Sequence, residues 1–174
     1  MPKTLRLVLL LLLLLLPGQA MAGTAVIEDA FSPRQGATDL IVKTIGEAQH
    51  SVRVAAYFFT SYPIAEALVK AHNRGVDVKL VLDSHQKFRR VIDYLDRNGI
   101  ATRINSHYAI MHDKFLIVDD ATLETGSFNF TRAAEYENAE NVLVIRDSPA
   151  TIGGYRRQWD KLWAEATEPG RGWL

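Results

Sequence analysis

The chain of 174 residues contains no cysteine. An oxidising compartment is therefore tolerated, but disulfides add nothing to the stability of the fold. An excess of charge of either sign is also missing, since 20 basic residues face 20 acidic ones. This balance excludes a strongly basic coat for nucleic acid. The sequence after residue 22 shows no repeat, low-complexity tract or linker, which predicts a single domain over residues 23–174.

Long apolar runs are missing everywhere except at the N-terminus. Lys3 and Arg6 precede an unbroken apolar run over residues 7–16, and the stretch 20–22 (Ala-Met-Ala) fits a small-x-small cleavage site. The apolar run is short for a membrane span, which needs about 20 residues. We therefore expect a signal peptide over residues 1–22, export to the periplasm or the medium, and no stable membrane association after cleavage. An uncleaved N-terminal anchor is the alternative.

The basic residues of the expected mature chain are few enough that their placement matters. Without the signal peptide, 18 basic residues face 20 acidic ones, a net charge of −2. Any binding of a polyanion then depends on a local basic patch. Two clusters are candidates for such a patch, with solvated helix surface as the alternative: Lys87, Arg89 and Arg90, and Arg156 and Arg157.

Strand-like and helix-like segments alternate over the first part of the domain, and short connections join them. This alternation predicts right-handed crossovers and parallel strand pairs. After residue 106 the pattern changes to a hairpin, a further strand and a final helix. We predict an α/β layered sandwich with a mixed, largely parallel β-sheet flanked by helices. The expected strands are 51–58, 77–82, 101–104, 114–118, 123–125 and 141–145, and the expected helices are 40–48, 64–71, 88–95 and 152–163.

One segment carries most of the chemistry in the sequence. Residues 112–129 contain His-x-Lys-x4-Asp and, after six further residues, Gly-Ser-x-Asn. His112 and Lys114 are two residues apart in an expected strand and therefore point the same way. Attack on a phosphodiester needs cationic and hydrogen-bonding groups around its oxygens, a role that suits Lys114 and Asn129. Histidine as a residue type titrates near neutrality, and His112 suits nucleophilic attack on phosphorus through a phosphohistidine.

Four further residues complete the predicted site. Asp119 has the opposite parity from His112, so we expect it to pair with backbone or a basic group at the hairpin and to act structurally. Gly126 permits the turn before Ser127. Ser127 either donates a hydrogen bond to the phosphate or the histidine, or caps local backbone as a turn hydroxyl. Glu140, directly before an apolar strand, is expected to fix the tautomer of His112 and raise its basicity.

Other candidate residues are weaker. His85 and Lys87 repeat His-x-Lys, but the next aspartate is one residue too far and no Gly-Ser-x-Asn follows, so we interpret this pair as unrelated. Tyr57 and Phe59 either line a groove or lie in the core. One His and one Lys do not make a coordination set, so we expect neither a metal nor another cofactor.

These motifs resemble those of the phospholipase D superfamily at every fixed position. The similarity to its small exported bacterial endonucleases extends over four more stretches: 31–33 (Phe-Ser-Pro), 56–60 (Ala-Tyr-Phe-Phe-Thr), 74–79 (Arg-Gly-Val-Asp-Val-Lys) and 124–131 (Glu-Thr-Gly-Ser-Phe-Asn-Phe-Thr). The resemblance implies a metal-free reaction. It also implies His112 as nucleophile, Lys114 and Asn129 as phosphate ligands, and Ser127 and Glu140 as supporting groups.

The number of motifs has a structural consequence. Enzymes of this superfamily generally use two such motifs, one histidine attacking and the other protonating the leaving oxygen, whereas this chain has one. The resemblance therefore implies a homodimer in which each subunit supplies one motif to a shared site. His112 of one subunit would attack, and His112 of the other would act as general acid and then as base for water.

Three functions follow from these expectations. The leading hypothesis is a sequence-nonspecific endonuclease acting on a nucleic acid substrate, DNA and possibly RNA. A lipid phosphodiesterase of the phospholipase D type is the first alternative, because the same groups cleave a head group. A nucleic-acid-binding protein without cleavage is the second, and the intact His112 and Lys114 weigh against it.

Overall fold

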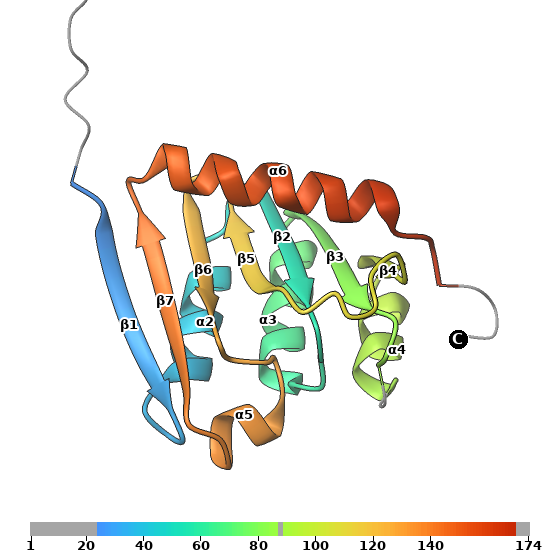
Figure 1. Cartoon of the computed structure of the whole chain (residues 1–174), viewed down its shortest axis with the longest axis horizontal. Coiled ribbons are helices and arrows are strands. Elements are labelled where there is room, and N and C mark those ends of the chain that lie inside the picture. The colour runs from blue at the N-terminus through green and yellow to red at the C-terminus, as the bar shows by residue number, and fades with distance from the viewer. Residues whose placement is uncertain (1–23, 87–88, 170–174) are drawn as a thin grey trace, which may run out of the picture.

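The computed structural model describes residues 24–86 and 89–169; the expected signal peptide and Lys87 lie outside the described residues. Within this part, the chain forms a seven-stranded sheet in the order β1-β7-β6-β5-β2-β3-β4, with helices on both faces (Figure 1). None of the described helices combines the length and apolar character needed to cross a bilayer. The strands are β1 (Val26–Ser32), β2 (Ser51–Ala56), β3 (Asp77–Asp83), β4 (Ala101–Asn105), β5 (Lys114–Val118), β6 (Thr122–Gly126) and β7 (Glu140–Arg146). The helices are α2 (Ala37–Gly46), α3 (Tyr62–Asn73), α4 (Arg90–Arg97), α5 (Arg132–Tyr136) and α6 (Pro149–Glu165).

The sheet is mixed and flanked by helices, as predicted, but the prediction that it is largely parallel is wrong. β2 pairs in parallel with β3, and β3 with β4. The other four neighbouring pairs are antiparallel. The prediction rested on the alternation of strands and helices, which ends at β4. Beyond β4 the connections lack a long crossover helix, and such connections join antiparallel strands.

The sequence analysis missed β1. This strand pairs with β7 along its whole length, and its last residue, Ser32, lies opposite Glu140, 108 positions away. Ala30 and Ser32 are buried, whereas Ile27 and Phe31 are about half exposed. A half-exposed edge strand has too weak an apolar signal to be predicted alone. Its pairing with β7 places Ser32 beside the predicted site.

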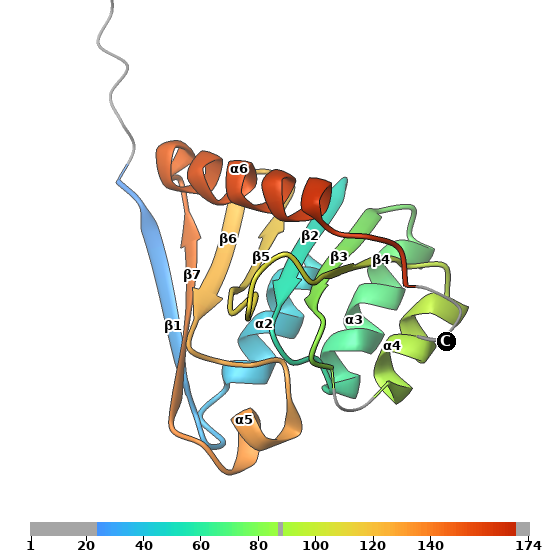
Figure 2. The same cartoon turned by 45° about the vertical axis from the view of Figure 1, so that its right-hand side comes forward.

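The sheet lies between two unequal helical layers (Figure 2). α2, α3 and α4 cover one face, and α6 crosses the other. The larger core lies on the three-helix side, where Ile41, Leu68 and Leu80 are fully buried. On the other side Trp159 of α6 is 3 % exposed and donates its indole N–H to the carbonyl of Val54 at 3.0 Å. This tryptophan therefore belongs to the core between α6 and the sheet.

Four strand ends meet at one edge of the sheet. β2 ends at Ala56 and β6 at Gly126, while β5 begins at Lys114 and β7 at Glu140. A Cβ atom at Gly126 would lie 2.1 Å from the carbonyl oxygen of Asn141. Glycine therefore allows β6 and β7 to approach this closely. The His-x-Lys start of the motif and its Gly-Ser-x-Asn end come together at these strand ends.

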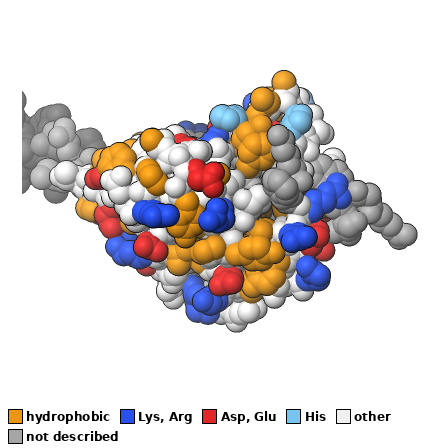
Figure 3. Space-filling model, turned by 90° about the horizontal axis from the view of Figure 1, so that it is seen from below, with side chains coloured by type: hydrophobic (Ala, Val, Ile, Leu, Met, Phe, Trp, Pro, Cys, Tyr) orange, Lys and Arg blue, Asp and Glu red, His pale blue; other side chains and the backbone are white. Residues whose placement is uncertain are grey.

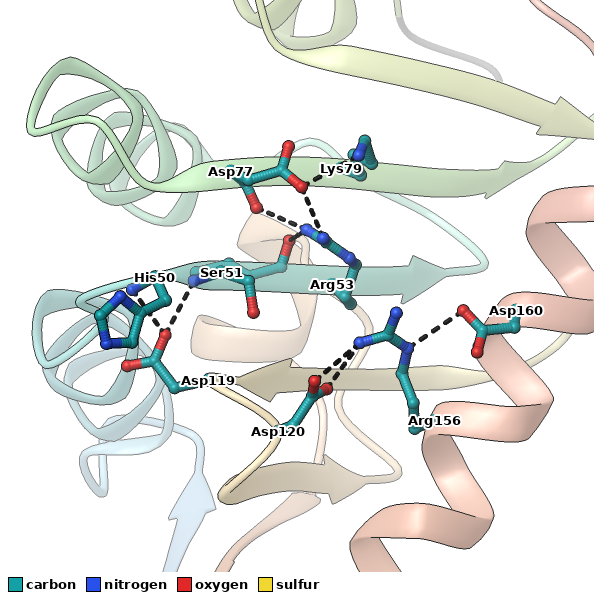
Figure 4. A network of polar contacts seen from close by, with 10 residues as sticks. His50, Ser51, Arg53, Asp77, Lys79, Asp119, Asp120, Arg156 and Asp160 are labelled. Carbon is teal, nitrogen blue, oxygen red and sulfur yellow. Dashed lines mark hydrogen bonds and ion pairs between the residues drawn. The ribbon is translucent and has the colours of Figure 1, made fainter.

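Asp119 lies at the opposite edge, at the other end of β5 from Lys114 (Figure 4). Its carboxylate accepts hydrogen bonds from the backbone N–H of Gln49 and His50 at 2.8 Å and of Ser51 at 2.7 Å. Partial burial raises the pKa of Asp119. The three backbone hydrogen bonds lower it by more, so the pKa lies below its ordinary value. The carboxylate thus holds the connection between α2 and β2.

Arg156 is already paired with carboxylates (Figure 4). Its guanidinium lies 2.7 Å from Asp120 and 3.0 Å from Asp160. The predicted basic patch of Arg156 and Arg157 is therefore reduced to Arg157, which is exposed.

Candidate active site

His112 and Lys114 lie side by side where β5 begins. The Lys114 Nζ is 3.1 Å from Nδ1 of His112 and donates to the His112 carbonyl oxygen at 2.6 Å. Lys114 is 9 % exposed, whereas His112 is exposed. The structure thus holds an ammonium group in the protein and leaves the imidazole beside it open to solvent.

The surroundings of Lys114 prepare it for an anion. Burial lowers the pKa of Lys114 below its ordinary value, and the carboxylates of Asp113 and Glu140 offset part of this effect. Its two contacts are to a ring nitrogen and a carbonyl oxygen, neither of which carries a full negative charge. An arriving phosphodiester supplies that charge and stabilises the ammonium.

Tyr57 forms one wall beside the histidine. It follows β2 directly, and its ring centroid lies 4.6 Å from that of His112. The Nζ of Lys114 lies 5.4 Å from the same ring. Phe59, by contrast, is fully buried and packs edge-on against Phe130 at 5.8 Å. Of the two predicted groove candidates, Tyr57 lies at the site and Phe59 belongs to the core.

Ser127 and Glu140 form a hydrogen-bonded pair across β6 and β7. The Ser127 Oγ donates to Oε2 of Glu140 at 2.5 Å and accepts the backbone N–H of Asn141 at 3.1 Å. The second carboxylate oxygen of Glu140 accepts the amide of Asn138 at 3.0 Å. The hydroxyl therefore links the end of β6 to the start of β7 and fixes the carboxylate, and its two predicted roles stay predictions.

The structure does not join Glu140 to His112 within one chain. No hydrogen bond connects the two side chains among the described residues, although the charge of Glu140 raises the pKa of Lys114. Ser127 likewise makes its hydrogen bonds to residues other than His112. The histidine-orienting role of Glu140 stays a prediction.

Asn129 presents an unsatisfied amide. The segment is anchored by Phe128 and Phe130, each 1 % exposed, on either side of it. Within the described part of the chain, the Oδ1 of Asn129 is buried and has no hydrogen-bond partner. The two ends of an amide exchange by a flip of the side chain. The role of Asn129 as a phosphate ligand stays a prediction.

An open pocket of about 360 Å³ joins these groups. It is lined by His112, Lys114 and Ser127 at the sheet edge and by Tyr155 of α6. Tyr155 is held by edge-on packing against Phe115 at 5.0 Å. A cavity of similar size, about 390 Å³, lies beside β4 and contains none of the motif residues. The motif residues therefore line the pocket of about 360 Å³ and not the cavity beside β4.

Two buried polar residues that the sequence analysis did not single out hold the loops around the site. Asp83, fully buried at the end of β3, accepts the backbone N–H of Met111 at 2.7 Å, directly before His112. Gln86, 9 % exposed, donates to the carbonyl oxygen of Tyr57. The sequence shows polar residues at and after the end of the apolar strand β3, and this signal could have pointed to Asp83 and Gln86. It does not show which backbone groups these side chains contact.

Asp83 also contacts His85, the histidine of the second His-x-Lys pair. The Nδ1 of His85 lies 2.8 Å from Oδ1 of Asp83. Among the described residues, no three His, Asp or Glu side chains gather as a metal-binding group. The absence of a metal from the reaction stays a prediction.

Comparison with known proteins relates this site to a family. Residues 41–163 match the family described as cardiolipin synthase, PLD-like domain. Phospholipase D of Rickettsia bellii is 38% identical over 136 residues, covering 76% of this chain and 67% of that protein. Mitochondrial cardiolipin hydrolase of Chlamydomonas reinhardtii is 37% identical over 121 residues, covering 68% of this chain and 54% of that protein. The chain thus spans roughly half to two thirds of the length of these curated relatives.

Solved structures share the fold. Nuc from Salmonella typhimurium, a phospholipase D family member, is 40% identical with a TM-score of 0.80, covering 83% of this chain and 98% of that one. NucT from Helicobacter pylori is 25% identical with a TM-score of 0.75, covering 83% and 99%. The family match includes the whole segment from His112 to Glu140. The chain therefore belongs to the phospholipase D superfamily and is a phosphodiester-hydrolysing enzyme.

Proposed function

We propose that the chain is a metal-independent, sequence-nonspecific endonuclease that hydrolyses DNA, and RNA as a further substrate, through a phosphohistidine on His112. The observation that carries this proposal is the exposed imidazole of His112 beside the buried ammonium of Lys114 at an open pocket. In the first step, the imidazole nitrogen bonds to phosphorus, the bond to the leaving oxygen breaks, and that oxygen takes a proton. In the second, water attacks phosphorus and the P–N bond breaks.

The first step requires a change in the contact between Lys114 and His112. Attack by Nε2 needs its lone pair, so the neutral ring must carry its proton on Nδ1. A charged ammonium only donates, and in the observed contact it leaves Nδ1 as the acceptor. Substrate binding must therefore draw the ammonium from the ring to the phosphate oxygens. Nδ1 then needs an acceptor, and a carboxylate such as that of Glu140 suits this role.

The proton for the leaving oxygen needs a second group. We propose a homodimer in which the partner subunit's His112 donates this proton and later takes one from water. A twofold axis close to His112 would bring the two exposed imidazoles to one phosphodiester. It would also offer the carboxylate of one subunit to the histidine of the other, which fits the missing contact within one chain.

Nucleic acid is favoured as the substrate by the parts of the chain that form the site. The stretches that resemble small exported endonucleases include 56–60, which carries Tyr57, and 124–131, which carries Ser127 and Asn129. Tyr57 and Ser127 lie at the pocket of His112 in the structure. A lipid phosphodiesterase is the second candidate, because the names of the similar proteins from Rickettsia bellii and Chlamydomonas reinhardtii refer to lipids.

The N-terminal segment bears on the compartment in which the protein acts. We propose that residues 1–22 direct export to the periplasm or the medium and are removed, which leaves the domain over residues 23–174. Fractionation of cells that produce the chain, followed by N-terminal sequencing, tests this. A chain that begins at Met1 and pellets with membranes would instead support the uncleaved anchor.

The function is tested with purified mature protein and supercoiled plasmid in excess EDTA, beside His112→Ala and a liposome assay for head-group release. Nicking by the wild type alone supports the proposal. Intact plasmid together with head-group release replaces it by the lipid phosphodiesterase. Plasmid that shifts on a gel yet stays intact supports the non-catalytic alternative, and equal nicking by His112→Ala contradicts the assignment of the nucleophile.

A further inference from the structure

A second pocket, of about 260 Å³, lies between the start of α3 and α5. α5 lies at the lower end of the molecule in Figure 1. The pocket is lined in part by Thr131, two residues from Asn129, and two residues span at most about 7 Å of backbone. A ligand in this pocket is therefore a neighbour of the reacting phosphodiester. The residues that line it have no role in the reaction described above.

Two tyrosines from different elements form the apolar part of this pocket. Tyr62 of α3 and Tyr136 of α5 both line it, and each is 46 % exposed. The ring of Tyr62 rests against Tyr94 at 6.1 Å. The guanidinium groups of Arg132 and Arg34 lie 5.1 and 5.7 Å from the ring of Tyr136. Exposed aromatic rings that are supported in this way suit the stacking of another planar ring.

The pocket also has a side suited to an anion. Ser61 precedes α3, is 6 % exposed and lines the pocket, and its hydroxyl makes no hydrogen bond in the described part of the chain. The first N–H groups of a helix lack acceptors within the helix. Pro63, the second residue of α3, has no N–H, which leaves those of Tyr62 and Ile64 at this helix start. Arg132 adds an exposed cation whose ion pair with Glu137 is 3.3 Å long. A buried free hydroxyl, a helix start and an arginine together favour phosphate.

The one acidic group at this pocket is already occupied, within the residues described. Glu135 lines the pocket, and its Oε2 accepts the hydroxyl of Thr38 at 2.6 Å and the backbone N–H of Thr38 at 3.1 Å. Its hydrogen bonds thus point toward α2. Seen from the side on which α5 lies, the surface shows hydrophobic side chains set among both basic and acidic side chains (Figure 3).

We infer that this pocket binds one nucleotide of a single-stranded nucleic acid beside the scissile phosphodiester. The base stacks on Tyr136, and the phosphate faces Ser61, the start of α3 and Arg132. A base inside a duplex is stacked on its neighbours and does not reach such a ring, so this pocket takes an unpaired nucleotide and favours single strands over duplex. A lipid head group supplies the anion but no planar ring. This inference rests on the proposed nuclease function.

The test compares Tyr136→Ala, Tyr136→Phe and the control Ile27→Ala, which removes an exposed side chain from β1. The KM for cleavage is measured on a single-stranded oligothymidylate and on the same sugar-phosphate backbone without bases. Stacking of one base is worth about 1–3 kcal/mol, so Tyr136→Ala should raise the KM for the oligothymidylate about tenfold. The same variant should show no rise on the abasic backbone. Tyr136→Phe, which keeps the ring, and Ile27→Ala should match the wild type.

Three results overturn the inference. They are an unchanged KM of Tyr136→Ala, an equal rise on the abasic backbone, and a change in the mass of Tyr136→Ala by light scattering. The last would make the tyrosines a contact between copies of the chain. Circular dichroism confirms that the variant is folded. If the wild type cleaves no nucleic acid at all, the proposed function fails; if it does and Tyr136→Ala behaves like the wild type, the pocket assignment alone fails.

Discussion

The Nζ of Lys114 lies 3.1 Å from Nδ1 of His112 and donates to the carbonyl oxygen of the same residue at 2.6 Å. In the proposed mechanism this ammonium group leaves the ring of His112 and binds the phosphate. Burial lowers its pKa, while Asp113 and Glu140 raise it in part. Lys114 thus loses its proton at a lower pH than an ordinary lysine does.

The alkaline limit of activity should report on Lys114. Rising pH removes the charge that holds the phosphate, so kcat/KM should fall at a pH below the ordinary lysine value of about 10.4. Lys114→Arg should move this alkaline fall of kcat/KM to higher pH, because a guanidinium stays charged. This shift is expected even if the maximal rate of the variant is lower than that of the wild type. Profiles of kcat/KM against pH for both proteins check this. An alkaline limb at the same pH in Lys114→Arg would show that another group causes it.

Gly126 should tolerate no side chain. The Cβ of Gly126→Ala would lie 2.1 Å from the carbonyl oxygen of Asn141, so β6 and β7 must separate. We expect the hydrogen bond between Ser127 and Glu140 to be lost and activity to fall at least tenfold, with a lower melting temperature. Gly46→Ala, where a Cβ meets nothing within 4 Å, is the matched control. Wild-type activity and stability of Gly126→Ala would contradict the described register.

Glu124 should make the fold less stable as pH rises. It is 1 % exposed in β6, and burial raises its pKa well above the ordinary value, offset in part by the backbone N–H of Leu116. The folded state keeps the proton that the unfolded state releases. The stability that this proton provides is therefore complete below the ordinary pKa of glutamate and is lost as pH rises toward the folded value.

The matching variant is Glu124→Gln, which keeps the shape and does not titrate. Urea unfolding at a series of pH values should show a smaller decline of the unfolding free energy with pH in this variant than in the wild type. Equal slopes in the two proteins would mean that Glu124 is ionised in the fold.

Asp119 should make the fold more stable as pH rises, which is opposite to the effect of Glu124. Its folded pKa is lowered, net, by the backbone hydrogen bonds from Ser51, Gln49 and His50, against the raising effect of burial. Its contribution is therefore present above the ordinary aspartate pKa and is lost as pH falls through the folded value. Asp119→Ala should cost about 2 kcal/mol of unfolding free energy at neutral pH, as expected for hydrogen bonds to a charged group. Asp29→Ala, on the exposed side of β1, controls for the loss of one charge, and an equal effect of the two variants would refute the structural role.

The parts of the site that could be predicted from the sequence are those that depend on residues close together along the chain. Residues two apart in a strand share a face, and His112 and Lys114 do lie together. The segment from Gly126 to Asn129 follows a strand that ends beside them. These relations depend on neighbours along the chain, so a single sequence shows them.

The remaining parts depend on register between distant strands. The hydrogen bond between Ser127 and Glu140 exists because β6 pairs with β7, and β1 reaches Glu140 from 108 positions away. Asp83 supports the loop before His112 through the backbone of Met111. No periodicity in the sequence specifies these pairings. This is why β1 was missed and the sheet was predicted to be largely parallel, although the hairpin of β5 and β6 was predicted.

The account depends most on a covalent bond between His112 and phosphorus. The direct measurement is the mass of the intact protein when turnover of a single-stranded oligonucleotide is stopped by rapid denaturation. We predict an acid-labile phosphoryl-nucleotide adduct on the wild type, located on the peptide that contains His112, and none on His112→Ala. Turnover without an adduct, an adduct on another residue, or cleavage by His112→Ala at the wild-type rate would contradict the mechanism.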